Sequence, residues 1–265
     1  MILSSASPIG LALSLAAAAA YAIPAAAASR LSQRGARIAL LAAWVLHGLV
    51  LAFSLLGPHP RFGFAPALSM TAWLVLTVYA IDRQVFPQME ARWALAALGA
   101  PAVLLTLVFP GTVLHPSASP MLPLHWALGI ASYGLFAAAV VHAWLMMRSE
   151  RHMRQATDPH AGMPLLTLER LTFRFVELGF LLLSATLLAG ILFGDPAGPG
   201  WRWDHKTVFS VGAWAAFALL LLGRARFGWR GRKAVRVLYF GSLLLLLAYV
   251  GSRFVLEVIM GRQGW

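Results

Sequence analysis

The sequence contains no cysteine and few charged residues, and both absences narrow what the protein can be. Of its 265 residues, 11% are charged and 60% are hydrophobic. A soluble domain carries about 25% charged residues, so this composition indicates a membrane protein. The lack of cysteine excludes disulfides, thiolate metal sites and thiol redox chemistry. A bound metal would therefore be held by histidine, methionine or carboxylate side chains.

The recognisable signatures of catalysis are also missing. The sequence shows no nucleophile–base pair, no phosphate-binding loop and no metal-hydrolase spacing. It shows no internal repeat and no polar stretch long enough to form a soluble domain. We therefore expect a single transmembrane domain covering residues 1–265, in a protein that is not an enzyme in its own right.

Long apolar runs fill most of the chain. Most of them reach the roughly 20 residues that a helix needs to cross a hydrocarbon core. The first run is rich in alanine and could pass for a signal peptide, but no basic residue precedes it, so we expect a spanning helix. The sequence predicts an all-α, polytopic membrane helix bundle of about eight transmembrane helices. The expected segments are 8–28, 38–57, 64–81, 92–109, 122–147, 169–194, 205–223 and 234–260.

Positive charge alternates from one side of the predicted membrane to the other. Most arginine and lysine residues lie in the loops that follow the first, third, fifth and seventh apolar segments. Loops rich in lysine and arginine stay in the cytoplasm, so both termini are expected outside. This placement accounts for the net charge of +12 without a nucleic-acid partner.

A cluster of aromatic and polar residues opens the seventh apolar segment, within GWRWDHKTVFSVGAW (200–214). It contains Trp201, Trp203, Asp204, His205 and Lys206. One interpretation is an interfacial belt, because tryptophan and lysine anchor helix ends at the lipid headgroups. The other is a platform on which indole rings and an imidazole hold a flat, metal-bearing ring. Both interpretations stay open on this stretch alone.

Four histidines lie within or at the ends of apolar segments, and His142, near the inner end of the fifth segment, is interpreted as a structural residue. His47 is near the middle of the second segment, whereas His125 and His205 lie near the outer ends of the fifth and seventh. An ionisable residue at membrane depth is a candidate functional residue, although His47 could equally be hydrogen-bonded core. Small residues on the same helical faces, Gly129 one turn from His125 and Gly212 two turns from His205, leave space beside the two imidazoles. Two neutral imidazoles on facing helices suit a six-coordinate porphyrin iron, so both are candidate metal ligands.

Cations near the outer histidines could meet the propionate groups of such a ring. Arg202 and Lys206 flank His205, and Arg253 lies in the outer half of the last segment. Arg253 also has Glu257 four residues further on, a spacing typical of an ion pair within one helix. Both roles of Arg253 remain open.

Three motifs resemble the cytochrome c assembly family, heme-handling membrane proteins of the CcsA type. PLHWALGIASYGLF (123–136) resembles the family's helix with a histidine and a Ser-Tyr pair. WRWDHKTVFSVGAW resembles its tryptophan-rich outer motif, and YFGSLLLLLAYVGSRFVLEVIMG resembles its last segment. The resemblance covers 38–262 in organisation and is closest to a small, eight-helix branch. It implies a bacterial inner-membrane protein with periplasmic termini and a non-covalent, b-type heme.

The departures from the family pattern bear on the ligands. His205 replaces the usual proline of the tryptophan-rich motif, and the family's later outer histidine is absent. By resemblance, His125 matches the outer heme-ligand histidine and His47 is a candidate for a deeper one. We infer that His205 supplies the second ligand, with Trp201 and Trp203 packed against the ring. Expected partners are the lipid bilayer, heme and other cytochrome c assembly or transporter proteins.

Two further functions fit the same sequence. Histidines and carboxylates could serve an accessory protein for divalent metal-ion transport or resistance. A membrane subunit that regulates tetrapyrrole synthesis is the other alternative. A deletion strain that is sensitive to metal but has normal cytochromes would favour the role in metal-ion transport. Co-purification with a biosynthetic enzyme would favour the regulatory role.

Overall fold

The computed structural model describes residues 8–26, 32–57, 60–85, 92–113, 122–154, 165–192 and 204–261. The chain divides into two compact units. Unit 1 comprises Met1–Asp82, Glu90–His115 and Arg253–Trp265, and unit 2 comprises Arg83–Met89 and Pro116–Ser252. Each unit is described by itself below.

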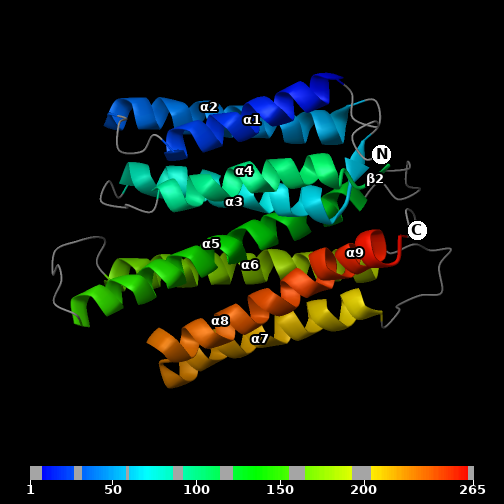
Figure 1. Cartoon of the computed structure of the whole chain (residues 1–265). Helices are drawn as coiled ribbons and strands as arrows, with labels where there is room; N and C mark the ends of the chain where they lie inside the picture. The colour runs from blue at the N-terminus through cyan, green and yellow to red at the C-terminus, as the bar shows by residue number, and fades with distance from the viewer. Residues whose placement is uncertain are drawn as a thin grey trace. The chain divides into compact units, whose positions relative to one another are not determined.

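Helices occupy all eight predicted apolar segments, which confirms the all-helical prediction (Figure 1). In unit 1 these are α1 (Pro8–Ala26), α2 (Gln33–Leu56), α3 (Phe64–Val85) and α4 (Arg92–Val108). In unit 2 they are α5 (Leu122–Arg154), α6 (Leu165–Leu192), α7 (His205–Phe227) and α8 (Gly231–Leu246). The helix of α8 continues through η2 (Leu247–Gly251), α9 (Ser252–Phe254) and η3 (Val255–Ile259).

Six helices in the described part of the chain are long and apolar enough to cross a membrane. The stretches that qualify run along α2, α3, α5, α6, α7 and the helix that begins with α8. The remaining two helices, α1 and α4, contain apolar stretches at Pro8–Ala22 and Leu98–Val108, which are shorter. The structure therefore supports a multi-pass helical protein, with six of the eight predicted spans meeting the length that a bilayer demands.

Unit 1 is built on close contacts of small residues and a pair of tryptophans. Ala17, Val50 and Val103 form a buried cluster where α1 meets α2 and α4. The indole rings of Trp44 and Trp73 stack with centroids 5.0 Å apart and join α2 to α3. Trp73 Nε1 also donates a 3.0 Å hydrogen bond to the Trp44 carbonyl, which satisfies a polar group that lipid could not.

The last described residues of the chain complete unit 1. Two short antiparallel strands, β1 (Arg61–Phe62) and β2 (Thr112–Val113), lie beside the start of α3. The Glu257 carboxylate reaches this point and accepts a backbone hydrogen bond from Phe64, the first residue of α3. A negative charge at a helix N-terminus is stabilising. Gly63 is required there, because a Cβ atom would lie 2.8 Å from Glu257 Oε1.

The core of unit 2 is one aromatic pair to which all four helices contribute. Phe136 of α5 and Phe217 of α7 stack with ring centroids 3.7 Å apart, and both are fully buried. Gly179 of α6 and Gly241 of α8 make room for these rings, since a Cβ at either would lie within 3.1 Å of one of them. The pairs α5–α6 and α7–α8 also pack side by side along their lengths (Figure 1).

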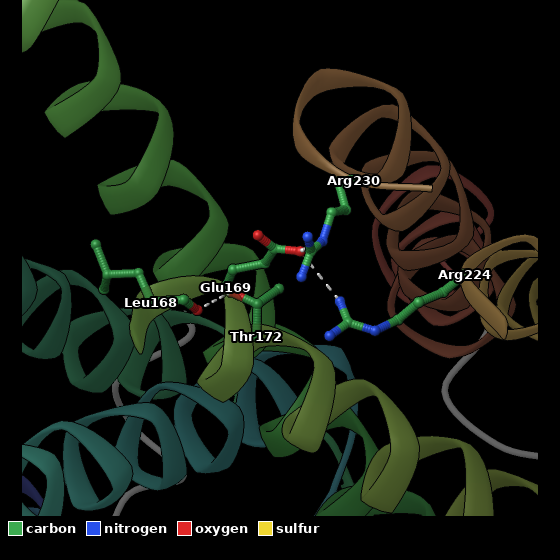
Figure 2. Close-up of polar contacts among 5 residues, drawn as sticks. All are labelled: Leu168, Glu169, Thr172, Arg224 and Arg230. Carbon is green, nitrogen blue, oxygen red and sulfur yellow. Dashed lines mark hydrogen bonds and ion pairs between the residues drawn. The ribbon is translucent and has the colours of Figure 1, made fainter. Parts of the chain in front are cut away.

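An ion-pair cluster fastens α6 to the turn between α7 and α8. Glu169 Oε1 lies 3.3 Å from Arg224 Nη1 and 3.0 Å from Arg230 Nε, as Figure 2 shows. The Arg224 guanidinium also lies 3.5 Å from the Phe173 ring centroid. The α7 helix ends at Gly228, whose φ of 61° is the left-handed conformation that glycine adopts readily.

The last helix departs from α geometry where a tyrosine from α5 meets it. In η2 the Ser252 N–H bonds the Leu247 carbonyl, five residues earlier instead of four. The Leu245 carbonyl accepts a hydrogen bond from the Tyr133 hydroxyl. Such single-turn π segments occur frequently at functional sites. Tyr133 therefore replaces part of the helix's own backbone bonding.

Candidate functional site

His125 has the geometry of an oriented ligand. It lies in the first turns of α5 and is partly buried. Its Nδ1 is 3.0 Å from the backbone carbonyl of Thr186 in α6. A carbonyl can only accept, so Nδ1 carries the proton and the lone pair of the neutral ring is on Nε2. A hydrogen bond of this kind fixes the tautomer and ring orientation of metal-ligating histidines.

Glycine makes this placement of the ring possible. A Cβ atom at Gly190 would lie 3.3 Å from Cε1 of His125, tighter than an ordinary van der Waals contact. One turn below His125, a Cβ atom at Gly129 would lie 3.5 Å from the Thr186 side chain. The small residues predicted beside His125 thus bring α5 close to α6, and the imidazole rests against that pair.

His205 opens α7 and is exposed. The residue before it, Asp204, is the helix N-cap, and its side chain accepts a 2.8 Å hydrogen bond from Thr207 N. Helix capping therefore explains the aspartate of the tryptophan-rich stretch. Trp201, Arg202 and Trp203 lie outside the described residues. Lys206 lies in the first turn of α7 and is partly buried.

The predicted site residues fall in both units. His125, His205 and Lys206 belong to unit 2, and His47 and Arg253 belong to unit 1. Among the residues that the structure describes, no hydrogen bond or ring contact joins His125 to His205. The pairing of these two imidazoles stays a prediction.

His47 is fully buried and both of its ring nitrogens are engaged. Nδ1 lies 3.2 Å from the Tyr21 hydroxyl of α1, and Nε2 lies 2.8 Å from the Ser69 hydroxyl of α3. A neutral imidazole has one donor and one acceptor, so one hydroxyl accepts and the other donates. The ring joins three helices, which favours the hydrogen-bonded interpretation of His47. Ligation of a metal would require one hydroxyl to release it.

Arg253 is buried and forms the predicted ion pair with Glu257, at 3.9 Å between Nη1 and Oε1. Both side chains are less than a tenth exposed. An arginine in a spanning helix is costly unless it is paired, so the pair itself accounts for its presence. A role toward an anionic ligand would be additional.

Among the remaining histidines, only His142 has a described side chain, and it does not extend the site. His142 of α5 is buried and donates from Nδ1 to the Ala138 carbonyl, 2.8 Å away in its own helix. His59, His115 and His160 lie outside the described residues, and the side chain of His152 is not described. Within the described ranges, no three histidine, cysteine, aspartate or glutamate side chains gather around a point that could hold a metal ion.

Several residues at these sites carried no signal in the sequence. The Thr186 contact is made by a backbone carbonyl, which any residue would supply. Tyr21 and Ser69 lie on separate helices from His47, and only the packing brings them to it. Asp204, in contrast, has the N-cap pattern that the sequence alone could have revealed.

Comparisons with known proteins place the chain in a family. Residues 34–260 match the family model described as cytochrome C assembly protein. The chain is 31% identical over 153 residues to the inner membrane protein YpjD of Escherichia coli K12, covering 56% of each chain. It is 30% identical over 211 residues to an uncharacterized 28.8 kDa protein of Azospirillum brasilense, covering 73% of this chain and 76% of that one.

A third relative carries a functional name. The cytochrome c biogenesis protein CcsA of Chlamydomonas reinhardtii is 25% identical over 213 residues, covering 76% of this chain and 60% of that one. The match to YpjD spans only about half of that relative's length, at 56%. No solved structure matches the chain. With nearly its whole length inside the family model, the chain is a membrane protein that belongs to the cytochrome c assembly family.

Proposed function

We propose that the protein binds and handles heme in the bacterial inner membrane, as a holder and not as an enzyme. Kinship with cytochrome c biogenesis proteins supports heme as the ligand. The single observation that carries the proposal is the His125 ring, whose proton on Nδ1 is held by Thr186 so that Nε2 presents a lone pair. A bound heme would supply an iron atom that accepts this lone pair.

In the proposed site the chain's own residues bind and orient the ring. His125 and His205 would hold the heme iron, near the outer face of the membrane. Trp201 and Trp203 would pack against the macrocycle, while Arg202 or Lys206 would meet the propionates. His47 stands as a deeper candidate. With no cysteine in the chain, the heme is held non-covalently, and covalent attachment would need the thiols of a partner protein.

The two alternative functions receive less support. A divalent metal site would need several ligands in one place, and the described residues bring no three together. A role in regulating tetrapyrrole synthesis would not explain why His125 is oriented with Nε2 free to bind a ligand. Heme handling is therefore the function that the geometry supports best.

The absorption spectrum of the detergent-purified protein from heme-replete cells tests the proposal. We expect a Soret band in the wild type and its loss in a His125→Ala, His205→Ala double variant. A His125→Gly variant should regain the band when imidazole is added, because free imidazole can occupy the vacated ligand position. A Gly190→Val variant should also weaken the band, since its side chain would push the ring away.

The matched control is His142→Gln, which changes a histidine of the same helix outside the proposed site. It should keep the band. A colourless wild-type protein, or a band that survives the double variant, would contradict the proposal.

A further inference from the structure

The exposed face of α8 carries a cluster of positive charge, and no carboxylate in the described part of the chain forms an ion pair with it. Arg232, Lys233 and Arg236 lie in its first two turns and are all exposed. Arg232 and Arg236 are four residues apart, so they are neighbours on one face and repel each other. The first turn contains no acidic residue, and cations are least favourable at a helix N-terminus. The cluster therefore costs free energy unless an anion accompanies it.

The nearby acid is already committed elsewhere. Glu169 bonds Arg224 and Arg230, which lie before the start of α8 (Figure 2). Within the described ranges, no ion pair reaches Arg232, Lys233 or Arg236. Among the described residues no carboxylate neutralises this face, which leaves it open to an anion from outside the chain.

A fourth cation and a hydroxyl border the same face. Helix α8 packs against α5 as well as α7. Arg151 of α5 is exposed and lies close enough to the Tyr239 hydroxyl of α8 for the two to interact electrostatically. Tyr239 is three residues beyond Arg236, about one turn along the same helical face, so Arg236 and Arg151 lie toward the same part of α8.

The face changes from basic to apolar along the helix axis. After Arg236 it continues with Tyr239, Phe240 and Leu243, which are 38%, 58% and 52% exposed. Beside the cluster, Lys233 Nζ lies 3.9 Å from the centroid of the Trp229 ring. Aromatic residues at the end of a spanning helix mark the headgroup level. The order along the helix is therefore cations, aromatic hydroxyl and then hydrocarbon.

We propose that this face binds an anionic glycerophospholipid. Its phosphate lies among Arg151, Arg232 and Arg236, and its acyl chains lie along Tyr239, Phe240 and Leu243. Arginine guanidinium groups match phosphate geometry well, and basic pockets between membrane helices bind acidic lipid headgroups. A free phosphate would leave the apolar part of the face unused, and an acidic peptide would have to enter the acyl region. The proposal does not depend on heme binding.

Positive charge at helix ends also sets membrane orientation, and orientation alone needs no lipid site. The two explanations differ in one respect. Orientation depends on the charge wherever it lies at that end of the helices, whereas a lipid site depends on these particular arginines. Arg170 and Arg174 of α6 are exposed as well and serve as the matched control.

Native mass spectrometry of the full chain in neutral detergent tests the proposal. The probes are phosphatidylglycerol and phosphatidylcholine with identical acyl chains. We expect phosphatidylglycerol to be retained in preference, and an Arg232→Gln, Arg236→Gln double variant to lower its affinity roughly 30-fold, about fivefold for each basic residue removed. The Arg170→Gln, Arg174→Gln control removes the same charge and should leave the affinity unchanged.

Other outcomes would overturn the proposal. Equal retention of the two lipids, or an equal loss of affinity in the control, would show that Arg232, Lys233 and Arg236 serve only to set membrane orientation. Displacement of the lipid by millimolar inorganic phosphate would assign the site to free phosphate. Displacement by a poly-glutamate peptide would assign it to an acidic protein partner.

Discussion

His47 and His125 differ in whether a ring nitrogen is left available to bind a ligand. Both nitrogens of His47 have hydroxyl partners, whereas His125 is bonded through Nδ1 to a backbone carbonyl. A histidine that bridges hydroxyl groups stabilises helix packing, and one held only at Nδ1 is oriented for a ligand at Nε2. Sequence position alone could not separate these roles, because both histidines lie in apolar segments.

At this scale, the first prediction concerns Ser69. A Ser69→Ala substitution removes the partner of His47 Nε2, and the free energy of unfolding should fall by about 1–3 kcal/mol because a buried polar atom is left unsatisfied. The Soret band should not change if His47 serves packing alone. Thermal unfolding in detergent and an absorption spectrum measure the two effects. Ser54→Ala, also in unit 1, is the matched serine control. A shifted Soret band in Ser69→Ala would identify His47 as a ligand.

At the scale of helices, the last helix is the element that the sequence predicted least completely. Its apolar run correctly predicted a helix, but nothing in the composition of Leu247–Gly251 predicted π geometry. At that point Tyr133, which lies more than a hundred residues earlier, donates to the Leu245 carbonyl, and we expect the π geometry to depend on this contact. The Ser-Tyr pair supported the family resemblance, yet its structural purpose is visible only in the fold.

A Tyr133→Phe substitution tests this dependence. Without the hydroxyl, the Leu245 carbonyl loses its donor, and we expect either a return to α geometry or faster local opening of the helix. Hydrogen–deuterium exchange of peptides covering residues 245–252 should change, while peptides from α6 should not. Tyr239→Phe, which alters a partly exposed tyrosine of α8, should leave the exchange of residues 245–252 as it is. Unchanged exchange in Tyr133→Phe would show that the π segment forms independently of this contact.

For the whole molecule, apolar runs predicted the number and order of the helices, and the family model covers nearly the range expected from the motifs. Boundaries were less accurate. Helix α5 extends to Arg154, beyond the predicted end at 147, because polar residues continue a helix outside the apolar run. The separation of the chain into two units could not be foreseen, since it depends on contacts between residues far apart in sequence.

The predicted orientation, with both termini outside, is testable because the natural chain has no cysteine. Single variants Ser5→Cys and Gln263→Cys should react with a membrane-impermeant maleimide in intact spheroplasts. Ala225→Cys, in the basic end of α7, should react only after the membrane is permeabilised. The cysteine-free parent gives the background. If Ala225→Cys were the only variant labelled in intact spheroplasts, the orientation would be the reverse of the predicted one.

The contact between Glu257 and the start of α3 joins a late segment of the polypeptide to an early one. Unit 1 takes its helices from the first part of the sequence and its final segment from Arg253 onward. Phe64 is synthesised nearly two hundred residues before Glu257. The N-terminus of α3 therefore lacks the Glu257 carboxylate until the last part of the chain has been made. The N-terminal half of this protein is thus finished last, after all of unit 2 has been made.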